Sequence, residues 1–305
     1  MRKIIFMLFL ILFILSISFF LIFYLFLNNV NYFNKNYNNS NYLNKKYTRI
    51  ISLSPEITEI IFELKKENKL IGRTDYCNYP KESLKIQSIG TLLNPNIEKI
   101  IELKPDLVIS SNYINKELYN TLKSLNIKII YFHSYKKIND LFNNINIIGN
   151  LLDSNNKSIE IINKLKLKIY ITKNKIKKFN KNFKYLNVYY MISFGREGDF
   201  TYGGDTFMNE IFNILNVNNI AKDIKGWRYS LESLIEKNPD IIIYGKKLIN
   251  KNELFLLEGY KNLKAIKNNK LFEINDDIYS RLTPRIINKG LDELLNIFYN
   301  KYYIK

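Results

Sequence analysis

The chain has 305 residues, of which 47% are hydrophobic and 24% charged, so it is long enough for two globular domains and is not typical of a disordered protein. Its net charge is +18, but lysines are spread along the whole chain, without a dense basic stripe or an RNA-recognition motif, so nucleic-acid binding is not expected. The single cysteine, Cys77, and the single histidine, His133, exclude an intrachain disulfide, a cysteine cluster and a multi-histidine metal site.

Residues 1–27 are predicted to be an N-terminal membrane anchor or signal segment. After Arg2 and Lys3 the sequence reads IIFMLFLILFILSISFFLIFYLFL, and a helix of this length, at about 1.5 Å per residue, can cross a hydrocarbon core of roughly 30 Å. No small-residue cleavage site follows, and no cysteine is available there for lipid attachment, which favours an uncleaved span over a cleaved signal peptide. Residues 28–47 are polar and rich in Asn, and are predicted to be a tether.

From Thr48 short β-type runs alternate with helical patterns, which is typical of parallel α/β units. Ser54 and Pro55 fit the N-cap and first position of a helix, and Asn94 and Pro95 mark the start of another. Strands are predicted at 49–53, 69–74, 107–110 and 127–132, and a further helix at 115–125. These elements form a predicted N-terminal lobe, residues 48–152.

Residues 153–180 are predicted to form one long helix between two lobes. Apolar side chains recur at intervals of three and four, with Thr172 in one gap, and lysines cover the other faces. The predicted buried stripe is Ile159, Ile162, Leu165, Ile169, Ile176 and Phe179. No Gly or Pro interrupts the pattern, so the segment is expected to be a rigid strut.

The second half, residues 181–305, repeats the first in outline. Strands are predicted at 184–192, 241–245 and 270–275, and helices at 206–216, 230–238 and 285–303. The predicted fold class is therefore α/β, with two Rossmann-like lobes joined by a single long backbone helix, after an N-terminal transmembrane segment.

A repeated stretch marks each lobe. NIEKIIELKPDLVIS (96–110) and SLESLIEKNPDIIIY (230–244) match with a constant spacing, so that Glu98 corresponds to Glu232. In each copy the apolar residues are predicted to be buried and the glutamates exposed; these apolar residues are Ile97, Ile100, Ile101, Leu231, Leu234 and Ile235. The glutamates fit two interpretations, as ordinary charges near a helix N-terminus or as a pair that docks on a symmetric partner carrying two arginines.

The same stretches carry a family resemblance. RIISLSPEITEI, DYCNYP and NIEKIIELKPDLVIS, followed by TYGGDTFMNEIF, the segment 219–243 and DDIYSRLTPRI, resemble the substrate-binding proteins of ABC importers for vitamin B12, ferric siderophores and haem. The resemblance covers most of residues 48–300. It implies a monomeric binding protein rather than an enzyme, at the extracytoplasmic face of the membrane, working with a permease dimer and its ATPase. Glu98 and Glu232 fall where the family meets arginines of the two permease subunits.

The resemblance also implies ligand-binding roles for four residues, and a glycine-bearing loop supplies a fifth candidate. Tyr76 in TDYCNYP and Trp227 in KGWRYS fall where the family places aromatic side chains, and Asp277 and Arg281 lie in the matching segment DIYSRLTPR; Phe200 is a further candidate. From the residues alone, Tyr76 would be a loop-packing residue and Asp277 with Arg281 a surface ion pair. Trp227, in a loop next to a glycine, is a good stacking surface.

The ligand is expected to be a corrinoid or a ferric chelate, and no resident cofactor is expected. Haem-binding members commonly place a tyrosine ligand where this chain has Thr91 and Leu92, which disfavours haem, and Thr91 also weakens the corrinoid assignment. No catalytic constellation is recognisable in the pattern, so no enzymatic activity is expected. A ligand-sensing ectodomain that signals to a membrane partner, and an α/β enzyme on a related fold, remain the alternatives.

Overall fold

The structure, a computed structural model, describes residues 46–111, 114–132, 136–179, 185–195, 199–246 and 251–301. The predicted anchor, nearly all of the predicted tether and His133 lie outside these residues. No helix within the described residues is both long enough and apolar enough to cross a membrane. All the residues described belong to one compact unit, Lys46–Lys305.

The first lobe is built on a four-stranded parallel sheet. Its strands are β1 (Ile50–Ser52), β2 (Leu70–Arg73), β3 (Leu107–Ser110) and β4 (Lys128–Tyr131), in the order β2-β1-β3-β4. All residues of β1 and β3 are buried, as expected for a parallel sheet that is covered on both faces. The helices of this lobe are α2 (Pro55–Glu63), α3 (Ile97–Glu102), α4 (Lys116–Ser124) and α5 (Ile138–Leu151), with short 3₁₀ turns η2 (Glu67–Lys69) and η3 (Lys81–Lys85).

The second lobe repeats this topology. Its parallel sheet contains β5 (Asn187–Met191), β7 (Asn218–Asn219), β9 (Ile241–Gly245) and β10 (Leu271–Ile274), in the order β10-β9-β5-β7. In both sheets the lobe's first strand therefore lies between its second and third strands. The helices are α7 (Phe207–Ile214), α8 (Leu231–Lys237), α9 (Lys251–Leu256), α10 (Lys264–Lys267) and α11 (Asp276–Tyr279). A small antiparallel pair, β6 (Asp199–Phe200) with β8 (Arg228–Tyr229), was not predicted.

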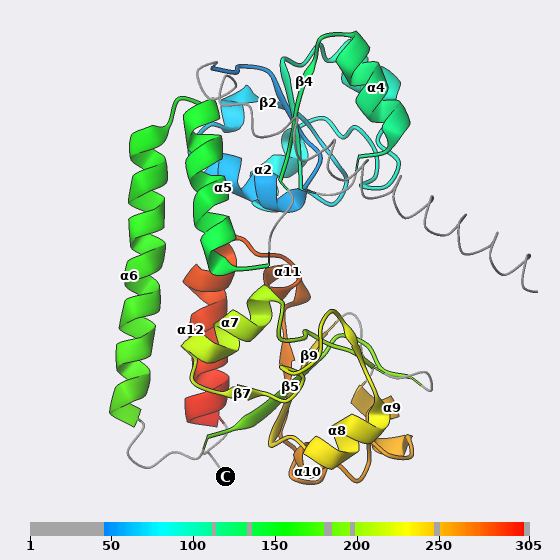
Figure 1. The fold of residues 1–305 in the computed structure, drawn as a ribbon, viewed down its shortest axis with the longest axis vertical. Coiled ribbons are helices and arrows are strands. Elements are labelled where there is room, and N and C mark those ends of the chain that lie inside the picture. The colour runs from blue at the N-terminus through cyan, green and yellow to red at the C-terminus, as the bar shows by residue number, and fades with distance from the viewer. Residues whose placement is uncertain are drawn as a thin grey trace, which may run out of the picture. The chain divides into compact units, whose positions relative to one another are not determined.

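The long helix α6 spans Asn155–Phe179 and packs against α5, α7 and the start of the C-terminal helix (Figure 1). The C-terminal helix consists of a π-helical turn (Ile286–Gly290), α12 (Leu291–Leu295) and a second π-helical turn (Asn296–Lys301). The prediction that Ile159 lies in the buried stripe of α6 is wrong, because its side chain is 53% exposed while Ile161 is buried. Residues two apart on a helix point about 200° away from each other, so only one of them can face the neighbouring helices.

One cluster of buried apolar residues joins the two lobes. It runs from Ile50 in the first sheet through Leu141 of α5 and Leu165 of α6 to Ile211 of α7 and Phe298 of the C-terminal helix. Separate clusters fill the other face of each sheet. The two lobes thus share one core with α6, which fixes the positions of their loops relative to each other.

The repeated stretch has a structural reason. The carboxylate of Asp106 accepts hydrogen bonds from the backbone N–H groups of Thr48 (2.9 Å) and Arg49 (3.0 Å), just before β1. The carboxylate of Asp240 accepts one from the backbone N–H of Asn187 (3.0 Å), at the start of β5. In each lobe the aspartate therefore joins the start of the third strand to the start of the first, so part of the repeat belongs to the fold.

The prediction that Ile101 and Ile235 are buried is wrong. Ile101 is 38% exposed and Ile235 is 45% exposed. The helices α3 and α8 are short, and each fully buries one residue only, Ile100 in α3 and Leu234 in α8. The next residue along each helix is turned away from the sheet and meets solvent.

Candidate ligand-binding site and docking helices

The short strands β6 and β8 bring two predicted ligand residues together. Phe200 pairs with Arg228 across the two strands, and the Thr201 N–H donates to the Trp227 carbonyl (2.7 Å). Phe200 is 42% exposed and Trp227 is 46% exposed. The Arg228 guanidinium lies 5.8 Å from the centre of the Phe200 ring, within the range of a cation–π contact. These strands thus present two aromatic side chains and one cation to solvent.

Tyr202 connects these strands to the segment that carries Asp277 and Arg281. Its ring centre lies 4.7 Å from that of Trp227, and its hydroxyl donates a hydrogen bond to the Tyr279 carbonyl at the end of α11 (2.9 Å). Tyr202 is almost fully buried, and this burial raises the pKa of its hydroxyl, which therefore stays a neutral donor. Tyr202 is a supporting residue beneath Trp227 rather than a residue on the exposed surface.

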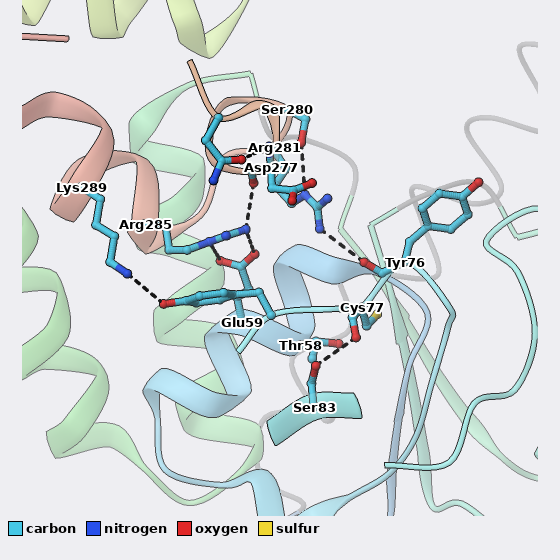
Figure 2. Close-up of polar contacts among 12 residues, drawn as sticks. Thr58, Glu59, Tyr76, Cys77, Ser83, Asp277, Ser280, Arg281, Arg285 and Lys289 are labelled. Atoms are coloured by element: carbon cyan, nitrogen blue, oxygen red, sulfur yellow. Dashed lines mark hydrogen bonds and ion pairs between the residues drawn. The ribbon is translucent and has the colours of Figure 1, made fainter. Parts of the chain in front are cut away.

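Arg281 links the second lobe to the loop of the first lobe that contains Tyr76. Its Nη1 donates to the Tyr76 carbonyl (3.5 Å) and its Nε to the Ser280 hydroxyl (3.3 Å). The Tyr76 side chain is 57% exposed, and Figure 2 shows its ring directed away from the arginines. The structure therefore brings Tyr76, Arg281 and Asp277 together, and Tyr202 connects them to Phe200 and Trp227.

A buried ion pair lies beneath this contact (Figure 2). Arg285 donates to both carboxylate oxygens of Glu59 on α2, with Nε to Oε2 at 2.9 Å and Nη2 to Oε1 at 2.5 Å. Its Nη2 also donates to the Asp277 carbonyl (2.8 Å), and its guanidinium lies 3.9 Å from the centre of the Tyr79 ring. Burial raises the pKa of Glu59, although the bonds from Arg285 oppose that shift. We call Glu59, Arg285 and Tyr79 the interlobe clamp.

Two cavities lie away from the predicted ligand residues. One of about 660 Å³ borders the clamp and is lined in part by Glu59, Phe62 and Tyr79. The other, of about 390 Å³, is lined in part by Phe142 and Lys166. Neither is lined by any of the five predicted ligand residues. The candidate site therefore consists of the exposed aromatic and arginine side chains, whose chemistry suits ligand binding.

Two further exposed side chains were not predicted. Leu93 is 82% exposed and precedes the first copy of the repeat by three residues, as Trp227 precedes the second copy. Arg228 follows Trp227 directly and lies over Phe200. The signal for Leu93 was present in the sequence, because the spacing that relates Glu98 to Glu232 also relates these two residues.

The two glutamates that were predicted to dock on a partner occupy equivalent places in the two lobes. The Asn96 side chain caps α3 by accepting from the Lys99 N–H (2.9 Å), and the Ser230 side chain caps α8 by accepting from the Ser233 N–H (3.1 Å). Glu98 and Glu232 are each the second residue of their helix and are exposed. Acidic residues in a first helical turn interact favourably with the helix dipole.

A buried carboxylate holds the strand that carries Phe200, and it makes stability depend on pH. Asp199 accepts hydrogen bonds from the hydroxyls of Tyr189 (2.9 Å) and Tyr260, and burial raises its pKa to about 6 despite these bonds. Because the folded pKa lies above the unfolded value, this group stabilises the fold at acid pH. That contribution is lost as the pH rises towards 6, by at most about 1.4 kcal/mol per pH unit.

We therefore expect Asp199→Asn to change the pH dependence of stability. The difference in free energy of unfolding between wild type and variant should move in favour of the variant between about pH 4 and pH 6. Urea denaturation at several pH values, followed by circular dichroism, measures it. If the free energies of unfolding of the two proteins changed with pH in parallel, the assignment of a raised pKa to Asp199 would be contradicted.

Comparisons with known proteins agree with this architecture. The Periplasmic binding protein family model matches residues 50–278. An uncharacterised ABC transporter substrate-binding lipoprotein, YvrC of Bacillus subtilis, is 30% identical over 258 residues, covering 82% of this chain and 79% of that protein. The vitamin B12-binding protein of Vibrio parahaemolyticus is 27% identical over 243 residues, and the match covers 78% of this chain and 85% of that protein.

A solved structure of a possible iron-binding, periplasmic solute-binding protein from Staphylococcus epidermidis superposes with a TM-score of 0.71. It is 29% identical, and the match covers 84% of this chain and all of that one. The match to the family model, the relatives and the fold lead to the same conclusion. This chain belongs to the periplasmic binding protein family, as a substrate-binding protein of an ABC transporter and not an enzyme.

Proposed function

We propose that this protein captures a corrinoid or a ferric siderophore and delivers it to an ABC permease. The observation that carries the proposal is the group of exposed aromatic side chains, Tyr76, Phe200 and Trp227, beside two arginines, Arg228 and Arg281. Aromatic faces stack on large ring systems and on apolar ligand surfaces. Arginines bind the amide and carboxylate groups of such ligands through several N–H donors.

The relatives support this class of ligand. They include the vitamin B12-binding protein of Vibrio parahaemolyticus, a possible iron-binding protein from Staphylococcus epidermidis and a haem uptake protein of Staphylococcus aureus that is 27% identical. Thr91 and Leu92 stand where haem-binding members commonly carry a tyrosine, and neither side chain is a haem iron ligand of that kind. We therefore rank haem below the other two.

The proposal is tested by ligand titration of the fragment 46–305. Trp227 is the only tryptophan of the chain, so its fluorescence reports directly on the candidate site. Cobalamin, ferric catecholate and hydroxamate siderophores and haem should be titrated in parallel. At least one of the first two classes should bind with a dissociation constant below about 100 μM, roughly −5.5 kcal/mol. If none does, the ligand assignment is wrong.

Variants of the site should separate ligand contacts from stability. Trp227→Ala and Arg281→Ala should each weaken binding by about 1–3 kcal/mol, because each removes a stacking surface or a charged hydrogen-bond donor. Calorimetry measures both, since Trp227→Ala has no tryptophan signal. Tyr170→Ala is the control, because Tyr170 is an exposed aromatic on α6 (64%) outside the site. Unchanged affinity in both site variants would refute these contacts.

We further propose that Glu98 and Glu232 dock on arginines of the two permease subunits. The equivalent, capped and exposed positions of the two glutamates support this role. Replacing both with alanine should reduce uptake at least tenfold in cells that contain the cognate permease, while the ligand affinity of the purified protein stays the same. Normal uptake by the double variant would rule the docking role out.

The apolar segment 4–27 is proposed to hold the protein at the extracytoplasmic face of the membrane. YvrC is described as a lipoprotein, whereas the one cysteine of this sequence lies at position 77, inside the first lobe. An uncleaved span would keep the protein near its permease. The mass of the mature protein, measured after membrane extraction, distinguishes an intact segment from a cleaved one.

A further inference from the structure

Each docking helix exposes an isoleucine between two glutamates. On α3 the exposed residues Glu98, Ile101 and Glu102 lie three and four positions apart, which places them on one face of the helix. On α8 the same pattern is formed by Glu232, Ile235 and Glu236. With 38% and 45% of their side chains exposed, Ile101 and Ile235 form the apolar centre of an acidic face in both lobes.

The two helices match at these three exposed positions but not at the exposed positions around them. The two copies differ at other exposed positions, such as Asn96 and Ser230 at the caps, or Lys104 and Asn238 after the helices. The glutamate–isoleucine–glutamate face is the same in both. A single exposed isoleucine needs no explanation, since most proteins have some. An isoleucine at the same exposed place in both lobes, with the same acidic neighbours, indicates a surface that meets two similar partners.

The electrostatic setting points to a basic partner. The chain as a whole has a net charge of +18, yet each face presents two carboxylates. Among the residues that the structure describes, none of these four glutamates forms an ion pair. Opposite charges orient two proteins as they meet, whereas buried apolar side chains at the centre of the contact supply most of the affinity.

We propose that Ile101 and Ile235 each insert into an apolar socket with a basic rim, one on each of two equivalent permease subunits. This inference rests on the proposed docking role of Glu98 and Glu232. The equivalent positions of α3 and α8, which lead into the third strand of two sheets with the same strand order, fit a partner made of two equivalent subunits. The glutamates pair with the rim and the isoleucines fill the sockets.

Photo-crosslinking of the full chain in cells that contain its permease tests the proposal without knowledge of the ligand. A photoreactive residue is placed at position 101, at position 235, or at position 167 as a control, because Leu167 is a 56% exposed apolar residue on α6. We expect positions 101 and 235 to cross-link to the same permease polypeptide, identified by mass spectrometry, each on one of its two equivalent copies, and position 167 not to do so. No cross-link to the permease from 101 or 235 would overturn the proposal.

Uptake of radiolabelled cobalamin or ferric siderophore provides the second measurement. Ile101→Ser and Ile235→Ser should each lower uptake at subsaturating protein about three- to tenfold, and together more, with ligand affinity and melting temperature unchanged because both side chains are already partly exposed. Leu167→Ser should have no effect. If Glu98→Ala with Glu232→Ala abolishes uptake but the double serine variant transports within twofold of wild type, the isoleucine proposal fails and the docking role stands. If neither double variant loses uptake, the docking role itself fails.

Discussion

Replacing Arg285 with alanine should lower the free energy of unfolding by about 3–5 kcal/mol, because the change leaves a buried carboxylate without its partner. Only 2% of the Glu59 side chain and 8% of the Arg285 side chain are exposed, and the two share two hydrogen bonds. Urea denaturation of the fragment 46–305, followed by circular dichroism, measures the loss. A change below about 1 kcal/mol would show that water or another cation replaces Arg285.

Two further variants separate the charge from the packing. Lys164→Ala removes one of the two exposed ion pairs of Glu160 on α6 and should leave the stability close to that of wild type. Glu59→Leu with Arg285→Met removes both buried charges together, and its stability should recover most of the loss, because no unpaired charge remains. A double variant as unstable as Arg285→Ala would mean that the bond from Arg285 to the Asp277 carbonyl, rather than the ion pair, dominates.

Arg285→Ala should also weaken ligand binding. Arg285 bonds the Asp277 carbonyl and lies against the ring of Tyr79, which shares its loop with Tyr76. The hydrogen bond from Arg281 to the Tyr76 carbonyl joins the loop of Tyr76 to the segment of Arg281. Loss of the clamp should make both of these segments more mobile. Glu59 and Arg285 are not among the proposed ligand-binding residues, so a loss of affinity in this variant reports on the positioning of the site.

The interlobe clamp could not be predicted from the sequence. Local patterns predicted the strands of the two parallel sheets except β7, and most of the longer helices, because hydrophobic periodicity reflects which face of each element meets the core. Glu59 and Arg285 are 226 positions apart, and neither is distinguished by its neighbours. A pair of this kind is specified by the packing of two lobes, which no local pattern contains.

The short helices α3 and α8 show a second limit of prediction from the sequence. Periodicity places Ile101 and Ile235 on the apolar side of their helices, but helices of six and seven residues touch the sheet at one buried position each. How far such a short helix is covered depends on neighbouring loops, not on its own pattern. In contrast, the sequence predicted that the two copies of the repeated stretch are equivalent. The matching strand orders of the two sheets agree with this prediction.

The adjacent glycines of TYGGD, Gly203 and Gly204, are evident in the sequence, but their structural role is not. In a sequence, adjacent glycines suggest a flexible turn or a phosphate-binding loop. In the structure, the N–H groups of Gly203 and Gly204 donate to the carbonyls of Gly226 (3.0 Å) and Ile224 (2.9 Å). The glycines allow the loop after β6 to lie directly on the backbone of the segment that leads to Trp227.

Gly204→Ala should therefore disturb both stability and ligand binding. A Cβ atom at position 204 would lie 1.8 Å from the Lys222 carbonyl oxygen, a backbone atom that no side-chain rotation can move away. The loop and the segment before Trp227 must separate, at a cost of about 3 kcal/mol in the free energy of unfolding. Since that segment sets the position of Trp227, ligand affinity should fall about tenfold or more.

Gly195→Ala is the matched control, because a Cβ atom there would meet nothing within 4 Å, and its stability and affinity should stay close to wild type. Urea denaturation gives the stability of both variants, and calorimetric titration gives their affinity. If Gly204→Ala lost stability but kept full affinity, the loop would relax without moving Trp227. Trp227 would then be a less important part of the ligand site than its exposed, aromatic position indicates.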